Sequence, residues 1–348
     1  MSIIKYSHAI RNAFADALAA DPQVTLMGLG ASDPTGIFGT TVGLAEEFGE
    51  ERVMDIPCAE NGMTGIAIGM ALGGKKVVLS HQRVDFALLT LEQIINQAAK
   101  WHYMFNGQDT VPIVIRMIIG RGWGQGPQHS QFLPTLFTHI PGLRVLTPTF
   151  PSDAYHLTRQ AIEDLNPVII FEHRWLHFGE GKVAEASPEN GYKAHVLQEG
   201  SDITLVSYSY GVLECLEATK VLSENGVSAE VIDLRSLAPL DFETVKASVV
   251  KTGRLLTFEH IWERGSTGTD IAARVSGSDI GLKAPIRRIN LPEYSLPTAR
   301  SLAANYYPDA ADIVEAVSEL FGRTNIPTPT KPVDYQEDKP NPAFKGPF

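Results

Sequence analysis

Two stretches of this sequence alternate short, strongly apolar segments with helical patterns, and this alternation restricts the fold more than any other feature. In the first half, six apolar segments of five to seven residues occur, over residues 24–30, 52–57, 76–80, 111–117, 144–148 and 167–172. Strands that are apolar on both faces are covered on both sides, as in a parallel sheet. Helical patterns separate them, over 61–72, 87–105 and 153–165. The first half therefore predicts a doubly wound α/β domain.

The second half repeats the alternation with a new set of segments. Predicted strands at 203–207, 229–234, 254–258 and 286–289 alternate with predicted helices at 211–223, 242–252 and 309–321. Residues 178–201 interrupt the pattern with Gly, Glu, Lys and Ser, which indicates a domain boundary. We therefore expect an α/β protein with two doubly wound three-layer domains, at 1–180 and 201–323. A linker at 181–200 joins them, and a proline-rich extended tail follows at 324–348.

Length, charge and cysteine content exclude several classes of protein. Single hydrophobic cores rarely grow beyond about 250–300 residues, so 348 residues favour two domains. The formal charge of −11 opposes binding to nucleic acid phosphates. No apolar run is long enough for a membrane span, and residues 1–22 predict an amphipathic helix and not a signal peptide. Cys58 and Cys215 form no disulfide or metal pattern, which is typical of a cytoplasmic protein.

Three loops are expected to carry the chemistry of the first domain. In open α/β sheets, ligands bind beyond the carboxyl ends of the strands, and the loops at 57–62, 81–86 and 120–129 follow predicted strands. In a parallel sheet their polar side chains converge at one edge: Glu60, His81, Gln82, Arg83, Arg121, Gln128 and His129. Zinc spacings such as HExxH and the GxSxG elbow of serine hydrolases are absent. Chemistry supplied by a bound cofactor is therefore favoured.

Glu60 and His129 each have a structural interpretation beside the functional one. Glu60 precedes a predicted helix, and the helix dipole stabilises acidic residues at that end. A lone histidine such as His129 is commonly structural, because its ring satisfies buried hydrogen bonds. The pattern of residues alone leaves both interpretations open.

Several long motifs resemble one known family. Residues 52–78, RVMDIPCAENGMTGIAIGMALGGKKVV, resemble the β subunit of the thiamine-diphosphate-dependent first component of 2-oxo acid dehydrogenase complexes, in the transketolase-like superfamily. The segments LEQIINQAAKWHYMFNGQDTVPIVIR, GPQHSQ, HIPGLRVLTP and AIEDLNPVIIFEH do so as well. The later run EVIDLRSLAPLDFETVKASVVKTGRLLTFEH is similar to the transketolase-type C-terminal domain of the same subunits. The resemblance extends over nearly the whole chain, from about residue 6 to residue 321.

The resemblance implies a domain that binds the pyrimidine ring of thiamine diphosphate. In the family, the glutamate of the first motif hydrogen-bonds N1′ of the aminopyrimidine and promotes its imino tautomer, and Glu60 matches it. Cys58 falls beside the pyrimidine, and Gln82 and Phe86 fall where related subunits place a polar side chain and an aromatic ring against the cofactor. For Phe86 an ordinary core role is the alternative. His129, in GPQHSQ, matches the histidine that assists acyl transfer to a lipoyl group.

The resemblance also implies that the chain is one part of a larger enzyme. In the family, the α subunit holds the diphosphate and its Mg²⁺ through a GDG motif, and this sequence contains no GDG. We therefore expect no Mg²⁺ site in this chain, an α partner that holds the Mg²⁺, and a β dimer within an α₂β₂ assembly. A lipoyl acyltransferase is the further partner that such an acyl-transferring enzyme would use.

One loop has two interpretations. The monovalent-cation site of the family, a K⁺ site, matches residues 161–166, with Ala161, Asp164 and Asn166 as oxygen ligands. A helix C-terminus with exposed polar residues explains the same sequence.

Two stretches depart from the family pattern. Related subunits usually have an acidic or apolar lead-in where this chain has Ser80-His81-Gln82-Arg83, and a loop rich in small residues where it has Arg121 and Trp123. These basic and imidazole groups, with Gln128, predict contacts to a polar or anionic substrate. Pairing of the charges with Asp85 or with a partner chain is the alternative.

Three functions are consistent with these residues. The first is the β subunit of a 2-oxo acid dehydrogenase that decarboxylates its substrate and passes the acyl group to a lipoyl acceptor. The second is a split transketolase-like or acyloin-forming enzyme with an aldehyde acceptor, favoured by the departures at 80–83 and 120–126. The third is a non-catalytic assembly subunit, which the presence of both Glu60 and His129 disfavours.

Overall fold

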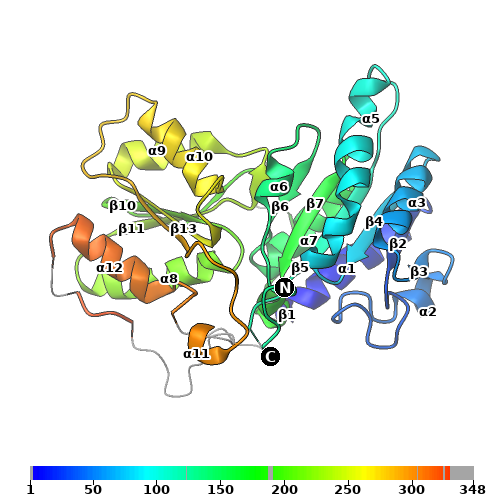
Figure 1. Cartoon of the computed structure of the whole chain (residues 1–348), viewed down its shortest axis with the longest axis horizontal. Helices are drawn as coiled ribbons and strands as arrows, with labels where there is room; N and C mark the ends of the chain where they lie inside the picture. The colour runs from blue at the N-terminus through cyan, green and yellow to red at the C-terminus, as the bar shows by residue number, and fades with distance from the viewer. Residues whose placement is uncertain (1–2, 123, 187–190, 304, 324–325, 330–348) are drawn as a thin grey trace. The chain divides into compact units, whose positions relative to one another are not determined.

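The computed structural model describes residues 3–122, 124–186, 191–303, 305–323 and 326–329 (Figure 1). The chain divides into two units. Of the described residues, unit 1 contains those within 3–120 and 128–191, and unit 2 contains those within 121–127 and 192–329. The segment Arg121–Pro127 therefore groups with unit 2, although the sequence pattern places it in the first domain. Trp123 and most of the predicted tail at 324–348 lie outside the described residues.

Unit 1 is built on parallel strands. They pair in the order β6 (Arg144–Leu146), β7 (Val168–His173), β5 (Ile113–Ile119), β4 (Lys76–His81), β2 (Val24–Gly28) and β3 (Val53–Asp55). Every residue of β2, β5 and β7 is buried, which explains why these segments are apolar on both faces. All six strands predicted for the first half are confirmed, with ends that differ by at most two residues.

Helices cover this sheet in two groups. In one, α1 (Tyr6–Ala20) packs on α7 (Pro151–Glu163), and in the other α3 (Glu60–Leu72) packs on the π-helical segment η2 (Gln93–Ala98). The single helix predicted over 87–105 is wrong in detail, because η2 lies in a series with α4 (Val84–Ala87), η1 (Leu88–Thr90) and α5 (Ala99–Met104). The shorter elements are α2 (Leu44–Phe48), α6 (Thr135–Thr138), η3 (Arg174–Phe178) and the antiparallel pair β1 (Ile3–Lys5) and β8 (Glu180–Lys182).

Unit 2 is a second three-layer α/β unit. Its strands pair in the order β14 (Arg287–Leu291), β13 (Leu255–Trp262), β10 (Ile203–Ser207), β11 (Ala229–Asp233) and β9 (His195–Gln198). All pairs are parallel except the one between β9 and β11, and β9 lies within the range predicted as a linker. Helices α9 (Phe242–Thr252) and α10 (Thr267–Ser276) cover one face, and α8 (Gly211–Glu224) and α12 (Ala310–Leu320) cover the other (Figure 1). The short elements β12 (Ser236–Ala238) and α11 (Arg300–Ala303) complete it.

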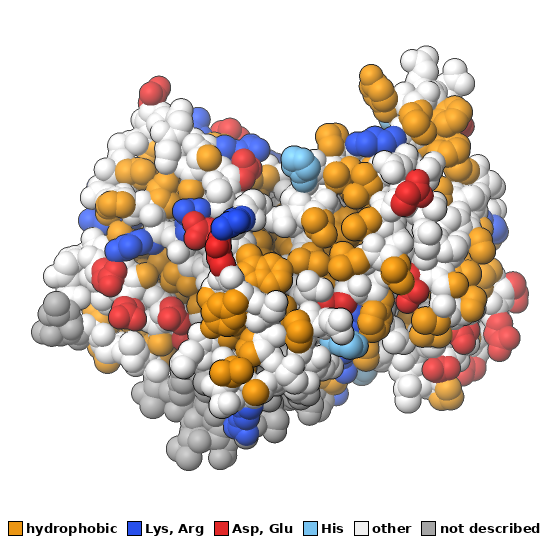
Figure 2. Space-filling model, in the orientation of Figure 1, with side chains coloured by type: hydrophobic (Ala, Val, Ile, Leu, Met, Phe, Trp, Pro, Cys, Tyr) orange, Lys and Arg blue, Asp and Glu red, His pale blue; other side chains and the backbone are white. Residues whose placement is uncertain are grey.

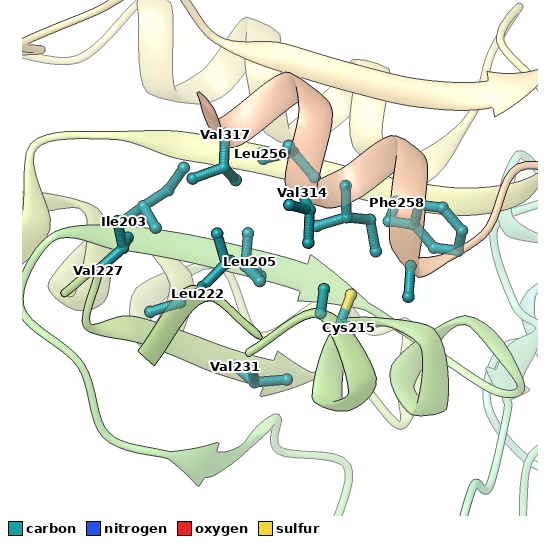
Figure 3. Packing of buried hydrophobic residues seen from close by; sticks show 14 residues of the cluster. Ile203, Leu205, Cys215, Leu222, Val227, Val231, Leu256, Phe258, Val314 and Val317 are labelled. Atoms are coloured by element: carbon teal, nitrogen blue, oxygen red, sulfur yellow. The ribbon is translucent and has the colours of Figure 1, made fainter. Parts of the chain in front are cut away.

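The core of unit 2 forms where α8 and α12 meet the sheet (Figure 3). Leu205, Val231 and Phe258 from the strands pack against Leu222 of α8 and Val314 of α12, and all are fully buried. Cys215 lies in this core as a free thiol, and burial raises its pKa. No helix among the described residues is long and apolar enough to cross a membrane.

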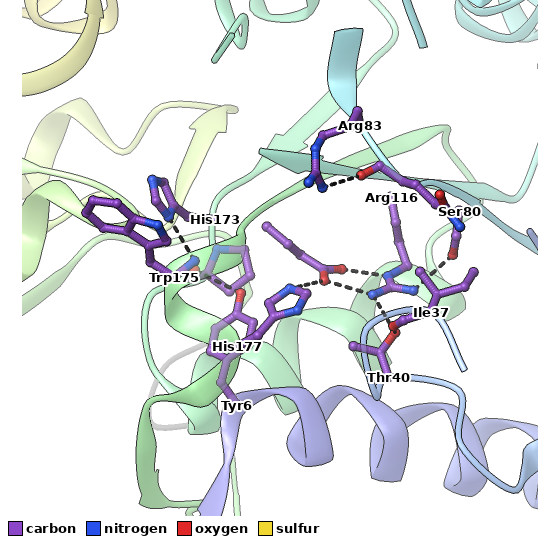
Figure 4. A network of polar contacts seen from close by, with 12 residues as sticks. Tyr6, Ile37, Thr40, Ser80, Arg83, Arg116, His173, Trp175 and His177 are labelled. Carbon is purple, nitrogen blue, oxygen red and sulfur yellow. Dashed lines mark hydrogen bonds and ion pairs between the residues drawn. The ribbon is translucent and has the colours of Figure 1, made fainter. Parts of the chain in front are cut away.

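A buried ion pair joins three central strands of unit 1 (Figure 4). Arg116 of β5 donates two hydrogen bonds to Glu172 of β7, at 2.6 and 2.8 Å, and neither side chain is exposed. The guanidinium also donates to Ser80 of β4 at 2.9 Å and to Thr40 at 3.1 Å. The ring of His177 lies 3.1 Å from the same carboxylate. Because every partner is buried, each charge depends on the others for stabilisation.

We expect Arg116→Met to lower the free energy of unfolding by about 3–5 kcal/mol, because it leaves the Glu172 carboxylate buried without its cation. The double variant Arg116→Met/Glu172→Leu should recover most of that loss. Lys76→Met removes two partly exposed ion pairs, to Asp21 and Glu163, and should cost about 1 kcal/mol or less. Urea unfolding of the three variants measures these differences, and a loss in Arg116→Met as small as that in Lys76→Met would contradict the assignment.

The same carboxyl group predicts a pH dependence of stability. Burial alone raises the pKa of Glu172, but the Arg116 guanidinium and the hydrogen bond to His177 bring it to about 2, from 4.5. A pKa that is lower in the folded state stabilises the fold above about pH 4.5, and this contribution is lost as the pH falls towards 2. Between about pH 5 and pH 2, unfolding free energies should therefore fall by about 3 kcal/mol more in the wild type than in Glu172→Gln. If the unfolding free energies of the two proteins changed equally with pH, this role of Glu172 would be contradicted.

Candidate active site

A pocket of about 150 Å³ lies at the carboxyl ends of β3 and β4 in unit 1. It is lined by Leu29, Ile56, Pro57, Cys58, Glu60, Ser80, His81, Gln82 and Phe86. The loops that follow the two strands thus meet at one edge, because both strands run parallel to β2 between them. The predicted convergence is confirmed for Glu60, His81 and Gln82.

Glu60 is the first residue of the helix α3 and is half-buried. A carboxylate in the first turn is stabilised by the unpaired amide groups of the helix end. The backbone carbonyl of Glu60 accepts a hydrogen bond from the Thr64 hydroxyl at 2.7 Å. Its Oε1 lies 3.7 Å from the Sγ of Cys58, a side chain that is exposed. The carboxyl group therefore faces the pocket next to the thiol.

Two walls of the pocket come from the loop after β4. The Gln82 amide donates to the backbone carbonyl of Leu29 at 2.9 Å, which ties this loop to the end of β2. Phe86, 38% exposed, lines the pocket and meets His129 edge-on, with ring centroids 5.5 Å apart and an interplanar angle of 89°. His129 itself is exposed. The ring of Phe86 thus places His129 beside the pocket.

Asp85 and Gln131 connect the segments that carry Phe86 and His129. The sequence pointed to Asp85 only as a charge partner and did not single out Gln131. The Asp85 carboxylate accepts hydrogen bonds from the side-chain amide of Gln131 at 2.8 Å and from its backbone N–H at 3.4 Å. Gln131 is two residues beyond His129, and Asp85 precedes Phe86. These contacts join the two short segments that carry the paired rings. The sequence offered one indication of this contact: Asp85 and Gln131 each lie within two positions of a predicted site residue.

His81 ends β4 and is almost completely buried, with 4% of its surface exposed. Burial lowers the pKa of its imidazole to about 4, although the nearby Glu60 carboxylate acts in the opposite direction. The ring is therefore neutral at pH 7 and adds no positive charge to the site. Its Nε2 is buried and has no hydrogen-bond partner among the described residues.

The other residues predicted to contact the substrate, Arg83, Arg121 and Gln128, lie outside the pocket lining. Arg83 is half-buried, donates to the backbone carbonyl of Gln82 at 2.9 Å and packs on the ring of Phe38 at 5.3 Å. Arg121 groups with unit 2, where it is 3% exposed and lies 4.0 Å from the ring centroid of Tyr307. Gln128 is an exposed residue of unit 1. Contacts of these three residues to a substrate stay a prediction.

The loop predicted as a cation site is an ordered helix end in unit 1. Asp164 Oδ1 accepts from the backbone N–H and the side-chain amide of Asn166, at 2.9 and 2.7 Å, and Oδ2 lies 2.6 Å from Arg144 Nε. Ala161 accepts the backbone N–H of Asp164. No cluster of three or more His, Cys, Asp or Glu suited to a metal occurs among the described residues. These contacts favour the helix-end interpretation, and the K⁺ site stays a prediction.

Comparisons with protein families agree with both units. Residues 2–177 match the transketolase pyrimidine binding domain, and residues 192–313 match the transketolase C-terminal domain. Among solved structures, a split-gene transketolase described as an inactive β₄ tetramer superposes with a TM-score of 0.72. It covers 92% of this chain and 98% of its own at 24% identity, so it supports the fold alone.

Comparisons with known proteins identify the family. The β subunit of acetoin:2,6-dichlorophenolindophenol oxidoreductase from Cupriavidus necator is 39% identical over 329 residues, 90% of this chain and 96% of that protein. The mitochondrial pyruvate dehydrogenase E1 component subunit β of Saccharomyces cerevisiae is 38% identical, over 90% of this chain and 87% of that one. The chain therefore belongs to the β subunits of thiamine-diphosphate-dependent E1 enzymes of the pyruvate dehydrogenase and acetoin oxidoreductase type.

Proposed function

We propose that this chain forms the pyrimidine-binding half of an active site that decarboxylates a 2-oxo acid and transfers the acyl group to a lipoyl acceptor. One observation carries the proposal. A helix-terminal carboxyl group, Glu60, and an aromatic ring, Phe86, line the same small pocket, and His129 packs against that ring.

The size and lining of the pocket fit an aminopyrimidine ring. A volume of about 150 Å³ matches cavities that accept a single benzene-sized ring. Leu29 and Ile56 offer apolar surface to such a ring, and Phe86 adds an aromatic one. Glu60 supplies the group that hydrogen-bonds a ring nitrogen. The residues present therefore fit one ring of thiamine diphosphate and leave its diphosphate to another subunit.

The protein side chains move and hold protons around this ring. Bound thiamine diphosphate supplies a nucleophilic carbon that adds to the 2-oxo carbon and holds the electron pair left when CO₂ departs. Glu60, the first residue of α3, would exchange a proton with N1′ of the aminopyrimidine. His129, held by Phe86 and by the Asp85–Gln131 contact, would donate or accept a proton at the substrate during acyl transfer.

Exposed apolar side chains of unit 1 support the presence of an α subunit. Ile66 of α3, Leu89 of η1 and Tyr103 of α5 are 53%, 65% and 88% exposed, and hydrophobic side chains gather over α5 in Figure 2. A Cβ atom added at Gly62 or Gly69 of α3 would meet nothing within 4 Å. Apolar and open surface of this kind is typical of obligate interfaces. Both relatives above are named as β subunits, and we infer that an α subunit covers this surface and completes the cofactor site.

Glu60→Gln keeps the shape of the side chain and removes its proton exchange. In the assembly with the α subunit, we expect kcat to fall at least about 100-fold, with thiamine diphosphate affinity changed less than about tenfold. Glu46→Gln is the matched control, since Glu46 is an exposed first-turn glutamate of α2 outside the pocket. Steady-state kinetics with cofactor titration measure both values. Activity retained within about tenfold would favour the non-catalytic alternative.

His129→Gln separates the two halves of the reaction. We expect acyl transfer to a lipoyl acceptor to fall about 100-fold or more, because an acid–base group is lost. Decarboxylation coupled to an artificial electron acceptor should fall less than about tenfold, since Glu60 is unchanged. His139→Gln, at an exposed histidine, is the control. Efficient turnover of the wild type with an aldehyde acceptor, and none with lipoamide, would instead support the split transketolase-like alternative.

A further inference from the structure

His81 is a polar residue of the pocket to which the proposed mechanism gives no role. It is the last residue of β4 and pairs with Met117 of β5, so the sheet holds its backbone. Neighbouring side chains of a strand point to opposite faces. The Ser80 hydroxyl accepts a hydrogen bond from Arg116, and the next side chain, His81, points to the opposite face of the sheet. Both residues line the pocket at the carboxyl end of the strand.

The burial of this imidazole has a cost that the described residues do not offset. Only 4% of the His81 surface is exposed, and its buried Nε2 has no protein partner among the described residues. A buried polar atom without a hydrogen bond destabilises a fold, whereas a phenyl ring of the same shape would not. A neutral imidazole has one donor and one acceptor nitrogen. A ligand in this pocket that donates a hydrogen bond to the imidazole, or accepts one from it, is the partner that the ring lacks.

We propose that His81 hydrogen-bonds the polar edge of the aminopyrimidine, as a second contact beside that of Glu60. This inference rests on the proposed function, because it takes the aminopyrimidine as the occupant of the pocket. His81 is then a specificity-determining residue that distinguishes a ring with polar groups at that edge from one without them. It acts by hydrogen bonding and not by charge.

The test is the affinity of the α/β assembly for thiamine diphosphate, measured by isothermal titration calorimetry. We expect His81→Phe to weaken binding about five- to tenfold, the equivalent of one net hydrogen bond. His81→Asn keeps a donor and an acceptor and should bind more tightly than His81→Phe. His139→Phe, at an exposed site, should bind as the wild type does. Melting curves confirm that the variants are folded, and His81→Asn still answers the question if His81→Phe does not assemble.

Analogues of the cofactor identify the contacted atom. Three analogues each lack one polar group of the ring, N1′, N3′ or the 4′-amino group. For the analogue that lacks the contacted group, the affinity of the wild type should fall by about the factor by which His81→Phe lowers the affinity for thiamine diphosphate. Removing that group should then lower the affinity of His81→Phe no further. Equal penalties in wild type and His81→Phe for all three analogues, or equal affinities for thiamine diphosphate, would overturn the role of His81 and leave the proposed function standing. Failure of the wild-type assembly to bind thiamine diphosphate would overturn both.

Discussion

The buried pair of Arg116 and Glu172 is the interaction on which the site in unit 1 depends. It links β5 to β7 and, through Ser80, to β4, at the level where the strands end and the site begins. Two opposite charges without solvent are tolerated only with good geometry and with their remaining hydrogen bonds satisfied. The hydroxyl groups of Ser80 and Thr40 and the ring of His177 supply those bonds. The hydrogen bond between Arg116 and Ser80 therefore holds the carboxyl end of β4 in one position.

The pocket follows from that position. Ser80 is committed to Arg116, so strand alternation turns His81 to the opposite face. The loop beyond it is tied back to β2 by Gln82 and carries Phe86 towards His129. A Cβ atom at Gly28 of β2 would lie 2.6 Å from the Cδ1 atom of Ile37 and 3.1 Å from the Cβ atom of Ser80, so a larger residue there would displace these side chains. A structural ion pair and a functional pocket thus share one strand, and each constrains the other.

Much of this could be predicted from the sequence, because buried parallel strands and helix ends have strong local signals. The strands of unit 1 and the convergence of Glu60 with Gln82 follow from apolar runs and the carboxyl-end rule. Helix α10 was missed, because Gly268 and several hydroxyl residues weaken its pattern. The start of α10 depends on both local and tertiary contacts. The Ser266 hydroxyl accepts from the backbone N–H of Thr269, and the backbone N–H of Gly268 donates to the Glu259 carboxylate of β13. Strand β9 was missed because its four half-buried residues form an antiparallel edge.

By itself, the sequence determined the layered α/β class, the order of the strands along the chain and the glutamate at the start of α3, because each depends on residues close together in the chain. Only the tertiary structure decided which side chains share a cavity. It buried His81 and left its imidazole neutral, and it joined Asp85 to Gln131 across 46 positions. It also grouped Arg121 with unit 2. Burial and long-range hydrogen bonds are properties of packing, and local spacing does not encode them.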